Sequence, residues 1–378
     1  MHVAWAAMGF SILSKGLIGI VLPGAVLVIY TLLERDWAIW KRIHLFSGIL
    51  LMLLIAAPWF ILVCRANPEF FHFFFIHEHF ERFLTKEHGR YHAWGYFIPI
   101  LLLGILPWVV TLFPALFDSW KRTSEKFQPG RFLFVWIVFI YLFFSFSDSK
   151  LPSYILPIFP AAALLIGKKL AETEGSRLSW HVLPVAFLGA AGLLLSPMVV
   201  RLSDPIVPAA LYSHYVPWLE AASIVALAGS LYAFVQSRRD SNGKAIVAIS
   251  IAILASGQLV LAGHNSLARS NSAYYLAQEI KPYLKKDVPF YSVAMYEQTL
   301  PFYIKRTVTP VAYKDEMAFG IEQEPDKWIP DIATFERIWK RERYALAIMS
   351  PEMYAQLDKT LPMELIAKDT RRVVVKTP

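Results

Sequence analysis

Leu45–Val63 reads LFSGILLMLLIAAPWFILV, an apolar run without a charged residue. Ala245–Gly263 is a second run of the same kind. A membrane-spanning helix needs about 20 mainly apolar residues, and both runs are close to that length. The chain of 378 residues is 56% hydrophobic and 17% charged, with a mean hydropathy of +0.45, whereas a soluble domain is about 25% charged. The sequence therefore predicts a polytopic α-helical membrane protein.

Further apolar runs bring the predicted number of transmembrane helices to about nine. Lys15-Gly16 separates the first two of them, and the polar turn Asp148–Pro152 separates the fifth from the sixth. The further runs are Val3–Ser14, Leu17–Leu33, Tyr96–Leu116, Phe132–Ser147, Tyr154–Gly167, His181–Val200 and Trp218–Gln236.

Loops rich in lysine and arginine alternate with loops that carry few of them. Basic loops stay in the cytoplasm, so the alternation predicts that Lys15, the Cys64–Gly95 loop, the Lys150 turn and everything after Gly263 lie outside. In a bacterium, this means a multi-pass protein of the inner membrane with those segments in the periplasm. Basic cytoplasmic loops also account for the net charge of +8, and we expect no nucleic-acid partner. The single cysteine excludes an intramolecular disulfide and a cysteine zinc cluster.

Residues 264–378 are more polar, and short strand-like runs alternate there with helical patterns. This alternation is typical of a small α/β domain. We therefore expect a transmembrane bundle over residues 1–263 and a periplasmic α/β domain over residues 264–378. The strand-like runs are Pro289–Met295, Tyr344–Met349, Leu365–Ala367 and Arg372–Lys376, and the helical patterns are Ser272–Leu284 and Ile332–Lys340.

Phe71–His92, which reads FHFFFIHEHFERFLTKEHGRYH, lies between two apolar runs and holds half of the chain's ten histidines. Ionisable residues at a membrane are costly and indicate a site. Glu78, His79 and Arg82 have the spacing of one helix face, and the forked donors of arginine suit phosphate. His77 and His79 are candidate ligands for a divalent metal, although their spacing is not that of a known metal motif. The alternative is an amphipathic interfacial helix.

Two polar turns are expected on the same side of the membrane. At Lys15-Gly16, the lysine could meet an anionic headgroup, or simply reach the interface from a plain turn. In Ser147–Tyr154, which reads SDSKLPSY, Lys150 and Tyr154 could both donate to a phosphate. Prolines in the following run predict a discontinuous helix of the kind that lines a cavity. The alternative for this second turn is a hairpin cap.

In order and spacing, these segments resemble the bacterial aminoarabinose (lipid A) transferases, membrane glycosyltransferases of the protein-mannosyltransferase type with the GT-C fold. The resemblance covers essentially the whole chain, and no single motif carries it alone. The matching segments are Leu13–Gly16, Ile76–Phe83, His92, Pro107-Trp108 and Ser149–Pro157, and in the tail Glu297–Tyr303, Glu316–Gly320 and Glu324-Pro325.

The resemblance implies that a sugar, typically 4-amino-4-deoxy-L-arabinose, moves from undecaprenyl phosphate to a lipid A phosphate on the periplasmic side. Cations and hydrogen-bond donors stabilise a phosphate leaving group. The residues implied to hold the donor phosphate are Arg82, Lys15, Lys150 and Tyr154, and those implied to shape the site are Glu78, His79 and His92. A divalent metal on His79 and His77 is a candidate addition, and no cofactor is required.

The chain departs from the family in one respect. Family members have more spans, and their acidic catalytic residues lie in the first periplasmic loop. No Asp or Glu precedes Glu34 here, and Glu34 and Asp36 are expected in the cytoplasm. We therefore expect this chain to correspond to the C-terminal portion, to lack the catalytic carboxylates and to be inactive alone.

Two other functions fit parts of the pattern. A transporter or flippase of a lipid-linked sugar should show internal repeats and ionisable residues near the middle of the membrane. Here the ionisable residues gather at one face, which favours an interfacial enzyme. A related transferase that modifies protein or another glycan would keep the same motifs, because they bind the carrier phosphate.

Overall fold

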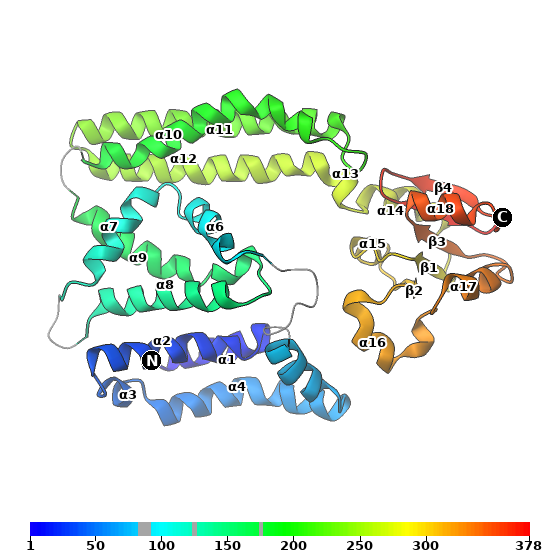
Figure 1. The fold of residues 1–378 in the computed structure, drawn as a ribbon, viewed down its shortest axis with the longest axis horizontal. Helices are drawn as coiled ribbons and strands as arrows, with labels where there is room; N and C mark the ends of the chain where they lie inside the picture. Colours follow the sequence, from blue (N-terminus) through cyan, green and yellow to red (C-terminus); the bar gives the residue numbers. More distant parts are fainter. Residues whose placement is uncertain (82–91, 123–126, 174–176) are drawn as a thin grey trace. The chain divides into compact units, whose positions relative to one another are not determined.

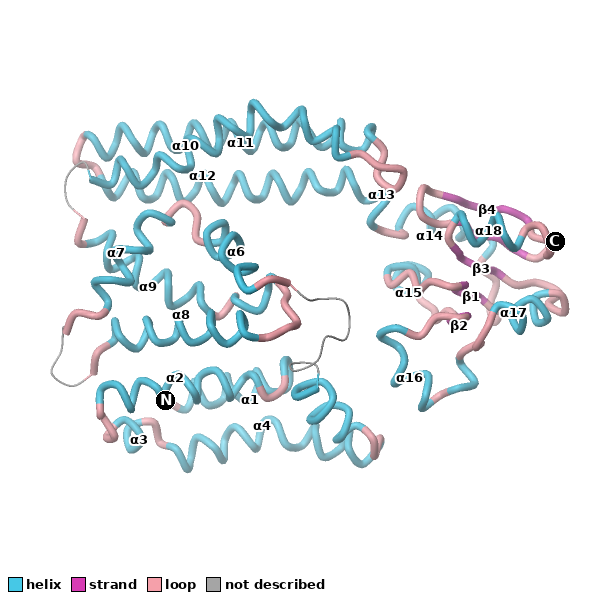
Figure 2. The backbone as a smooth tube through the Cα atoms, in the orientation of Figure 1, coloured by secondary structure: helices cyan, strands magenta, loops and turns pink. Residues whose placement is uncertain are grey.

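The computed structural model describes residues 1–81, 92–122, 127–173 and 177–378 (Figure 1), except for the side chains of residues 77–81 and 316. The chain divides into two compact units, residues 1–184 with 232–247 and residues 185–231 with 248–378. Helices make up the first unit, and the five-stranded sheet lies in the second (Figure 2).

Most of the first unit consists of helices that run back and forth between its two ends. In chain order they are α1 (His2–Lys15), α2 (Ile18–Glu34), α3 (Ile39–Arg42), α4 (Leu45–Ala66), the π-helix η1 (His72–Glu81), η3 (Trp94–Tyr96), α6 (Phe97–Gly104), α7 (Val109–Ser119), α8 (Pro129–Phe146), η4 (Pro152–Ile155) and α9 (Ile158–Ala171). Three longer helices, α10 (Leu178–Leu195), α11 (Ala209–Arg238) and α12 (Asn242–Gly263), have residues in both units.

Five helices of the described residues are long and apolar enough to cross a membrane. They are α4, α8, α10 with its 3-10 extension η6 (Ser196–Leu202), α11 and α12. The shorter helix α2 is also apolar. The protein is therefore a multi-pass membrane protein, and the number of about nine spans stays a prediction.

The predicted span Tyr96–Leu116 is two helices rather than one. α6 and α7 are bent by 107° at a short break. Pro107 lies in this break, and proline has no N–H to donate and disfavours helical backbone at the residue before it. Composition identified an apolar segment of sufficient length, but the proline divides it.

α1 packs closely on α4 through a tryptophan and a glycine. The Nε1 of Trp5 donates a hydrogen bond of 2.8 Å to the carbonyl oxygen of Ile43, and the indole covers Gly48. A Cβ at Gly48 would lie 2.1 Å from the Trp5 Nε1, so only glycine fits there. In a membrane, such small residues let helices approach.

The turns of the first unit alternate between its two ends. In Figure 1 the α1–α2 turn, η1 and the α8–α9 turn lie at one end, which we call the Lys150 end. At the other end lie α3 and the C-terminal ends of α7 and α9, and we call it the Glu34 end. This alternation is the one that the basic loops predicted.

Ion pairs join the basic loops at the Glu34 end. Arg131 Nη1 lies 2.6 Å from Glu34 Oε1, and Lys169 Nζ lies 2.5 Å from Asp118 Oδ2. The Asn242 Nδ2 donates to the Thr173 carbonyl oxygen at 3.2 Å, which places the α11–α12 turn beside the end of α9. The basic loops that follow α2, α7, α9 and α11 are thus brought together, and carboxylates offset part of their positive charge.

The sheet of the second unit has the strand order β2-β1-β3-β5-β4. β2 (Thr309–Val311), β1 (Phe290–Val293) and β3 (Leu346–Met349) are parallel, and β5 (Val373–Lys376) runs antiparallel to β3 and to β4 (Glu364–Lys368). The α/β prediction is confirmed, and four of the five strands overlap predicted runs. β2 was not predicted, because its central residue is Pro310, which counts against a strand except at an edge.

Helices cover both faces of the sheet, because alternate strand residues point to opposite faces. Tyr291 and Val293 pack in one cluster with residues of α17 (Ile332–Trp339) and α18 (Pro351–Leu357). Phe290 packs in the other with α14 (Tyr274–Ile280) and α15 (Thr299–Ile304). α16 (Ala318–Gln323) follows β2. The predicted helices Ser272–Leu284 and Ile332–Lys340 correspond to α14 and α17.

A buried arginine of the α/β domain, Arg372, binds the segment that follows α12. Arg372 is fully buried, and its guanidinium lies 2.9 Å from Glu297 Oε2 and 2.6 Å from Asp369 Oδ2. Its Nη2 also donates to the carbonyl oxygens of Arg269, at 3.1 Å, and Ser272, at 2.9 Å. The first carbonyl lies within α13 (Ala268–Asn271) and the second directly after it, and α13 follows α12 and the turn η7 (His264–Leu267). α12 ends at Gly263, and the domain boundary after it stays a prediction.

Candidate functional site

The turn between α8 and α9 is built by its prolines. α8 ends at Phe146, and Leu151 is extended because Pro152 disfavours helical backbone before it. Pro152 opens the 3-10 turn η4, so α9 begins only at Ile158, later than predicted. The Trp136 Nε1 of α8 donates to the Pro157 carbonyl oxygen at 2.8 Å. The sequence expectation of a discontinuous helix here is confirmed.

Lys150 is buried in this turn, with 3% of its surface exposed. Its Nζ donates to the carbonyl oxygens of Ser147, at 2.5 Å, and His92, at 3.0 Å. A lysine is rarely buried to this extent, so Lys150 is a candidate for a function beyond that of a hairpin cap.

His92 contacts Lys150 through its backbone carbonyl and not through its side chain. Its carbonyl oxygen accepts from Lys150, while its ring stacks on Tyr96 with the ring centres 4.2 Å apart. The carbonyl contact joins segments 58 residues apart in sequence. Motif reasoning selected His92 for its side chain, and no sequence signal indicates the carbonyl contact.

Tyr154 lies four residues after Lys150 and is half-buried. Its ring packs on Phe144 with the ring centres 5.1 Å apart. This contact holds the Tyr154 ring against α8 and so limits where its hydroxyl group can lie.

Two buried serine hydroxyls accompany Lys150. The Oγ atoms of Ser145 and Ser149 have no hydrogen-bond partner within the part of the chain that the structure describes. A buried hydroxyl without a partner costs about 1–3 kcal/mol, so such groups indicate an acceptor supplied from elsewhere. Sequence reasoning missed Ser145, since a serine in an apolar helix gives no signal by itself, and it included Ser149 only as part of the turn motif.

Lys15 is exposed at the C-terminal end of α1, where a cation is favoured by the helix dipole. The next residue, Gly16, has φ 74°, a left-handed conformation that favours glycine. The α1–α2 turn lies at the same end of the unit as the α8–α9 turn (Figure 1). Lys15 is therefore placed at the Lys150 end, as the sequence predicts.

The side chains of the remaining candidate residues lie outside the part of the chain that the structure describes. Arg82 falls in the segment 82–91, and η1 carries His77, Glu78 and His79, whose side chains are not described. Their roles stay predictions. Among the described residues, no group of three or more His, Cys, Asp or Glu side chains could hold a metal ion, and no chemical step here is assigned to a metal.

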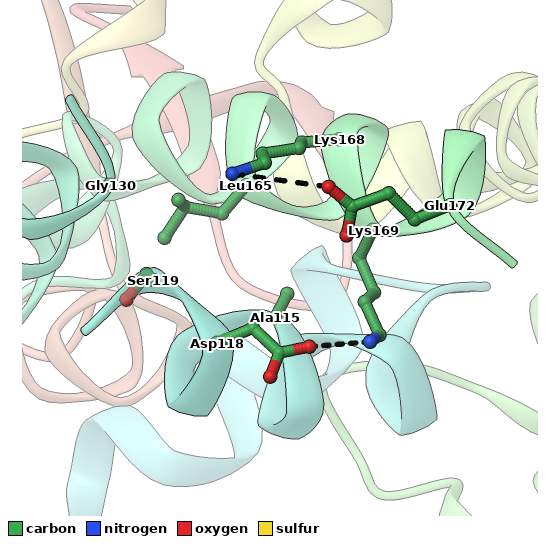
Figure 3. Close-up of a pocket in the computed structure, with 8 residues that line it drawn as sticks. All are labelled: Ala115, Asp118, Ser119, Gly130, Leu165, Lys168, Lys169 and Glu172. Carbon is green, nitrogen blue, oxygen red and sulfur yellow. Dashed lines mark hydrogen bonds and ion pairs between the residues drawn. The ribbon is translucent and has the colours of Figure 1, made fainter. Parts of the chain in front are cut away.

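A small pocket at the Glu34 end is a poor alternative site. Its lining includes Asp118, Lys168 and Lys169 (Figure 3), and its volume is only about 20 Å³, which holds about one water molecule. Lys169 is paired with Asp118, and Lys168 lies 3.9 Å from Glu172. The pocket has no room for a sugar or a lipid phosphate.

Comparisons with known proteins agree on one family. Residues 276–377 match the model described as the aminoarabinose transferase C-terminal domain. The chain is 34% identical over 203 residues to an undecaprenyl phosphate-alpha-4-amino-4-deoxy-L-arabinose arabinosyl transferase of Erwinia tasmaniensis. The aligned region covers 51% of this chain and 35% of that protein. With the transferase of the same name from Enterobacter sp., the identity is 29% over 263 residues, covering 67% and 46%.

A solved structure matches nearly the whole chain. The crystal structure of ArnT from Cupriavidus metallidurans bound to undecaprenyl phosphate superposes with a TM-score of 0.92 and 39% identity, covering 98% of this chain and 68% of that one. The chain spans about a third to a half of the length of the two curated relatives described above.

Proposed function

This chain belongs to the aminoarabinose transferase family, and on that premise we propose that it binds the phosphate of undecaprenyl-phosphate-linked 4-amino-4-deoxy-L-arabinose and serves the transfer of that sugar to lipid A. The observation that carries the proposal is the match of 98% of the chain, at 39% identity, to a structure bound to undecaprenyl phosphate. The buried Lys150 in the α8–α9 turn supports it.

The chemistry assigned to this chain is stabilisation of the leaving group. When the sugar leaves the carrier, negative charge grows on the phosphate, and positioned donors lower the barrier where that charge develops. Lys150 is held by two carbonyl oxygens and would meet the phosphate without a large rearrangement. Tyr154 and Lys15 would add donors, together with Arg82.

The proposed location is the inner membrane of a bacterium, with the Lys150 end and the C-terminal α/β domain in the periplasm. The alternation of basic and less basic turns between the two ends supports this orientation. Both the lipid-linked donor and lipid A are amphiphiles, so a site at the end of the bundle can receive their headgroups while their chains remain in the bilayer.

Binding of undecaprenyl phosphate by the purified chain in lipid nanodiscs tests the proposal. Lys150→Met should weaken binding roughly tenfold or more, because a charge-assisted hydrogen bond contributes about 1.5–3 kcal/mol, and Lys150→Arg should retain part of it. The matched control is Lys168→Met, which removes the same charge at the Glu34 end. Equal affinity of Lys150→Met and Lys168→Met would contradict the proposed phosphate site.

A second measurement separates a transferase from a flippase. Vesicles that carry the protein are supplied with the lipid-linked sugar and lipid A, and the lipids are analysed by mass spectrometry. A complete transferase yields sugar-modified lipid A and free undecaprenyl phosphate, whereas a flippase moves the intact donor between leaflets. This chain, which we expect to be inactive alone, should do neither. Movement of the donor without cleavage would overturn the transferase proposal.

A further inference from the structure

An open pocket of about 410 Å³ lies in the second unit, where α11 begins and α12 ends. Its polar and aromatic lining comes from the first turns of α11 and from the turn and short helices that follow α12. These lining residues are His214, Trp218, Asn265, Ser266, Arg269 and Tyr275. The pocket is large enough for a small ligand, since binding pockets are commonly about 300–1,000 Å³.

The donors in this pocket suit an anion. Arg269 is the only residue with a full charge among the described residues that line it, and no carboxylate is among them. Its guanidinium lies over the Tyr275 ring, 4.9 Å from the ring centre. Stacking on an aromatic face leaves the edge of the guanidinium, with its forked N–H groups, free to meet a phosphate. Asn265 adds an amide donor.

The pocket is held rigid from two sides. At its base, α11 and α12 are in close contact, because a Cβ at Gly263 would lie 2.4 Å from the Trp218 Cβ. On the domain side, the carbonyl oxygen of Arg269 accepts from the buried guanidinium of Arg372 at 3.1 Å. Arg269 therefore has a fixed backbone, and its binding geometry is prepared before a ligand arrives.

An apolar stripe leads along α12 toward the pocket. Ile251, Leu254 and Leu261 share one face of α12, with the exposed Gln258 between the last two, and 60–68% of the surface of these three apolar residues is exposed. Such a stripe on a membrane helix is a surface for acyl chains. Trp218 and Tyr275 are about two-fifths exposed at the end of the helices, the depth at which aromatic residues meet lipid headgroups.

We propose that this pocket, named the Arg269 pocket, binds the phosphate of an anionic phospholipid in the leaflet on the side of the C-terminal domain. The headgroup phosphate meets Arg269 and Asn265, and the acyl chains lie along the α12 stripe. This site is separate from the proposed carrier site at Lys150 and does not depend on the transfer reaction. A bound lipid there would tie the end of α12 to the domain that follows it.

Native mass spectrometry of the full chain in detergent tests the site, with phosphatidylglycerol and phosphatidylcholine as the probes. Wild-type protein should retain one phosphatidylglycerol in preference to phosphatidylcholine. Arg269→Gln should lower that retention roughly tenfold or more, because a charge-assisted contact to phosphate is lost. Arg269→Lys should retain most of it. The matched control is Arg201→Gln, which removes the charge of another exposed arginine, in η6 after α10.

Equal losses in Arg269→Gln and Arg201→Gln would overturn the proposal, since they would indicate nonspecific attraction of lipid to surface charge. A soluble arm with glycerol 3-phosphate separates a lipid site from a free phosphate site. Weak or absent competition by glycerol 3-phosphate supports the lipid, because the acyl chains contribute to binding. Full displacement of phosphatidylglycerol by glycerol 3-phosphate at equal concentration would contradict it.

Discussion

At the residue scale, Lys150 and Arg372 are both basic side chains that are buried. Lys150 is held by two carbonyl oxygens at the candidate site, whereas Arg372 is neutralised by Glu297 and Asp369 inside the α/β domain. Arg372 is therefore a structural residue that holds the domain together. The proposed role of Lys150 rests on its burial in the α8–α9 turn.

Arg372→Leu should destabilise the α/β domain strongly. Removing one partner of a buried ion pair leaves uncompensated charge and costs about 3–5 kcal/mol, and here two carboxylates and two carbonyls lose their partner. Thermal unfolding of the full chain in detergent measures the loss. Arg341→Leu, a change of an exposed arginine in the same domain, should have little effect, and similar melting of the two variants would contradict the structural role.

Tyr291 should make the α/β domain sensitive to alkali. Burial, together with the neighbouring carboxylate of Glu342, raises the pKa of Tyr291 to about 12. Between the ordinary pKa of 10.0 and this value, the folded state holds a proton that the unfolded state loses. Stability should therefore fall as pH rises above 10, by at most ~1.4 kcal/mol per pH unit.

The check is a thermal melt of the full chain at pH 9, 10 and 11. Tyr291→Phe cannot titrate and should lose less stability than the wild type over that range. Parallel curves for the two proteins would show that Tyr291 does not contribute to the alkaline loss.

At the element scale, local pattern predicted the elements that are long and regular. The Leu45–Val63 run became α4, and Ala245–Gly263 became most of α12. The failures lie where a proline changes a local pattern, at the α6–α7 break and at β2. β2 pairs only with β1 and is an edge strand, where Pro310 is tolerated. Whether a strand lies at the edge depends on the order of all strands in the sheet, and the three residues of β2 alone do not predict it.

Gly48→Ala should separate α1 from α4. The added methyl group would overlap the Trp5 indole, and overpacking costs about 1–3 kcal/mol. Gly257→Ala in α12 is the matched control, because no heavy atom lies within 4 Å of its added Cβ and the gain in helix propensity is similar. Unfolding in increasing SDS should show a loss for Gly48→Ala alone; equal stability of the two variants would contradict the close packing.

At the scale of the whole molecule, the distribution of charged turns agrees with the direction of the helices. In the first unit, helix direction alternates as the lysines and arginines predict (Figure 1). The ion pairs of Glu34 and Asp118 gather the basic loops at one end. The candidate site and the C-terminal domain belong to the segments that this alternation assigns to the other side of the membrane.

Cysteine labelling tests this orientation. In a Cys64→Ser background, which removes the single native thiol, Asp240→Cys and Asp326→Cys place one thiol in the α11–α12 turn and one in the α/β domain. Acidic residues contribute little to orientation, so neither change should alter it. An impermeant maleimide added to intact cells with a permeable outer membrane should label position 326 and spare position 240. Labelling of 240 alone would reverse the proposed topology.

The sequence by itself determined the membrane bundle, the α/β domain and the segments that hold the candidate residues. Those properties depend on composition, length and local periodicity, which a chain carries along itself. Only the tertiary structure decided that the His92 carbonyl holds Lys150, that Trp5 covers Gly48 and that Arg372 reaches Glu297. Each of these contacts joins residues more than 40 positions apart, and their energy comes from burial and geometry that exist only once the chain has folded back on itself.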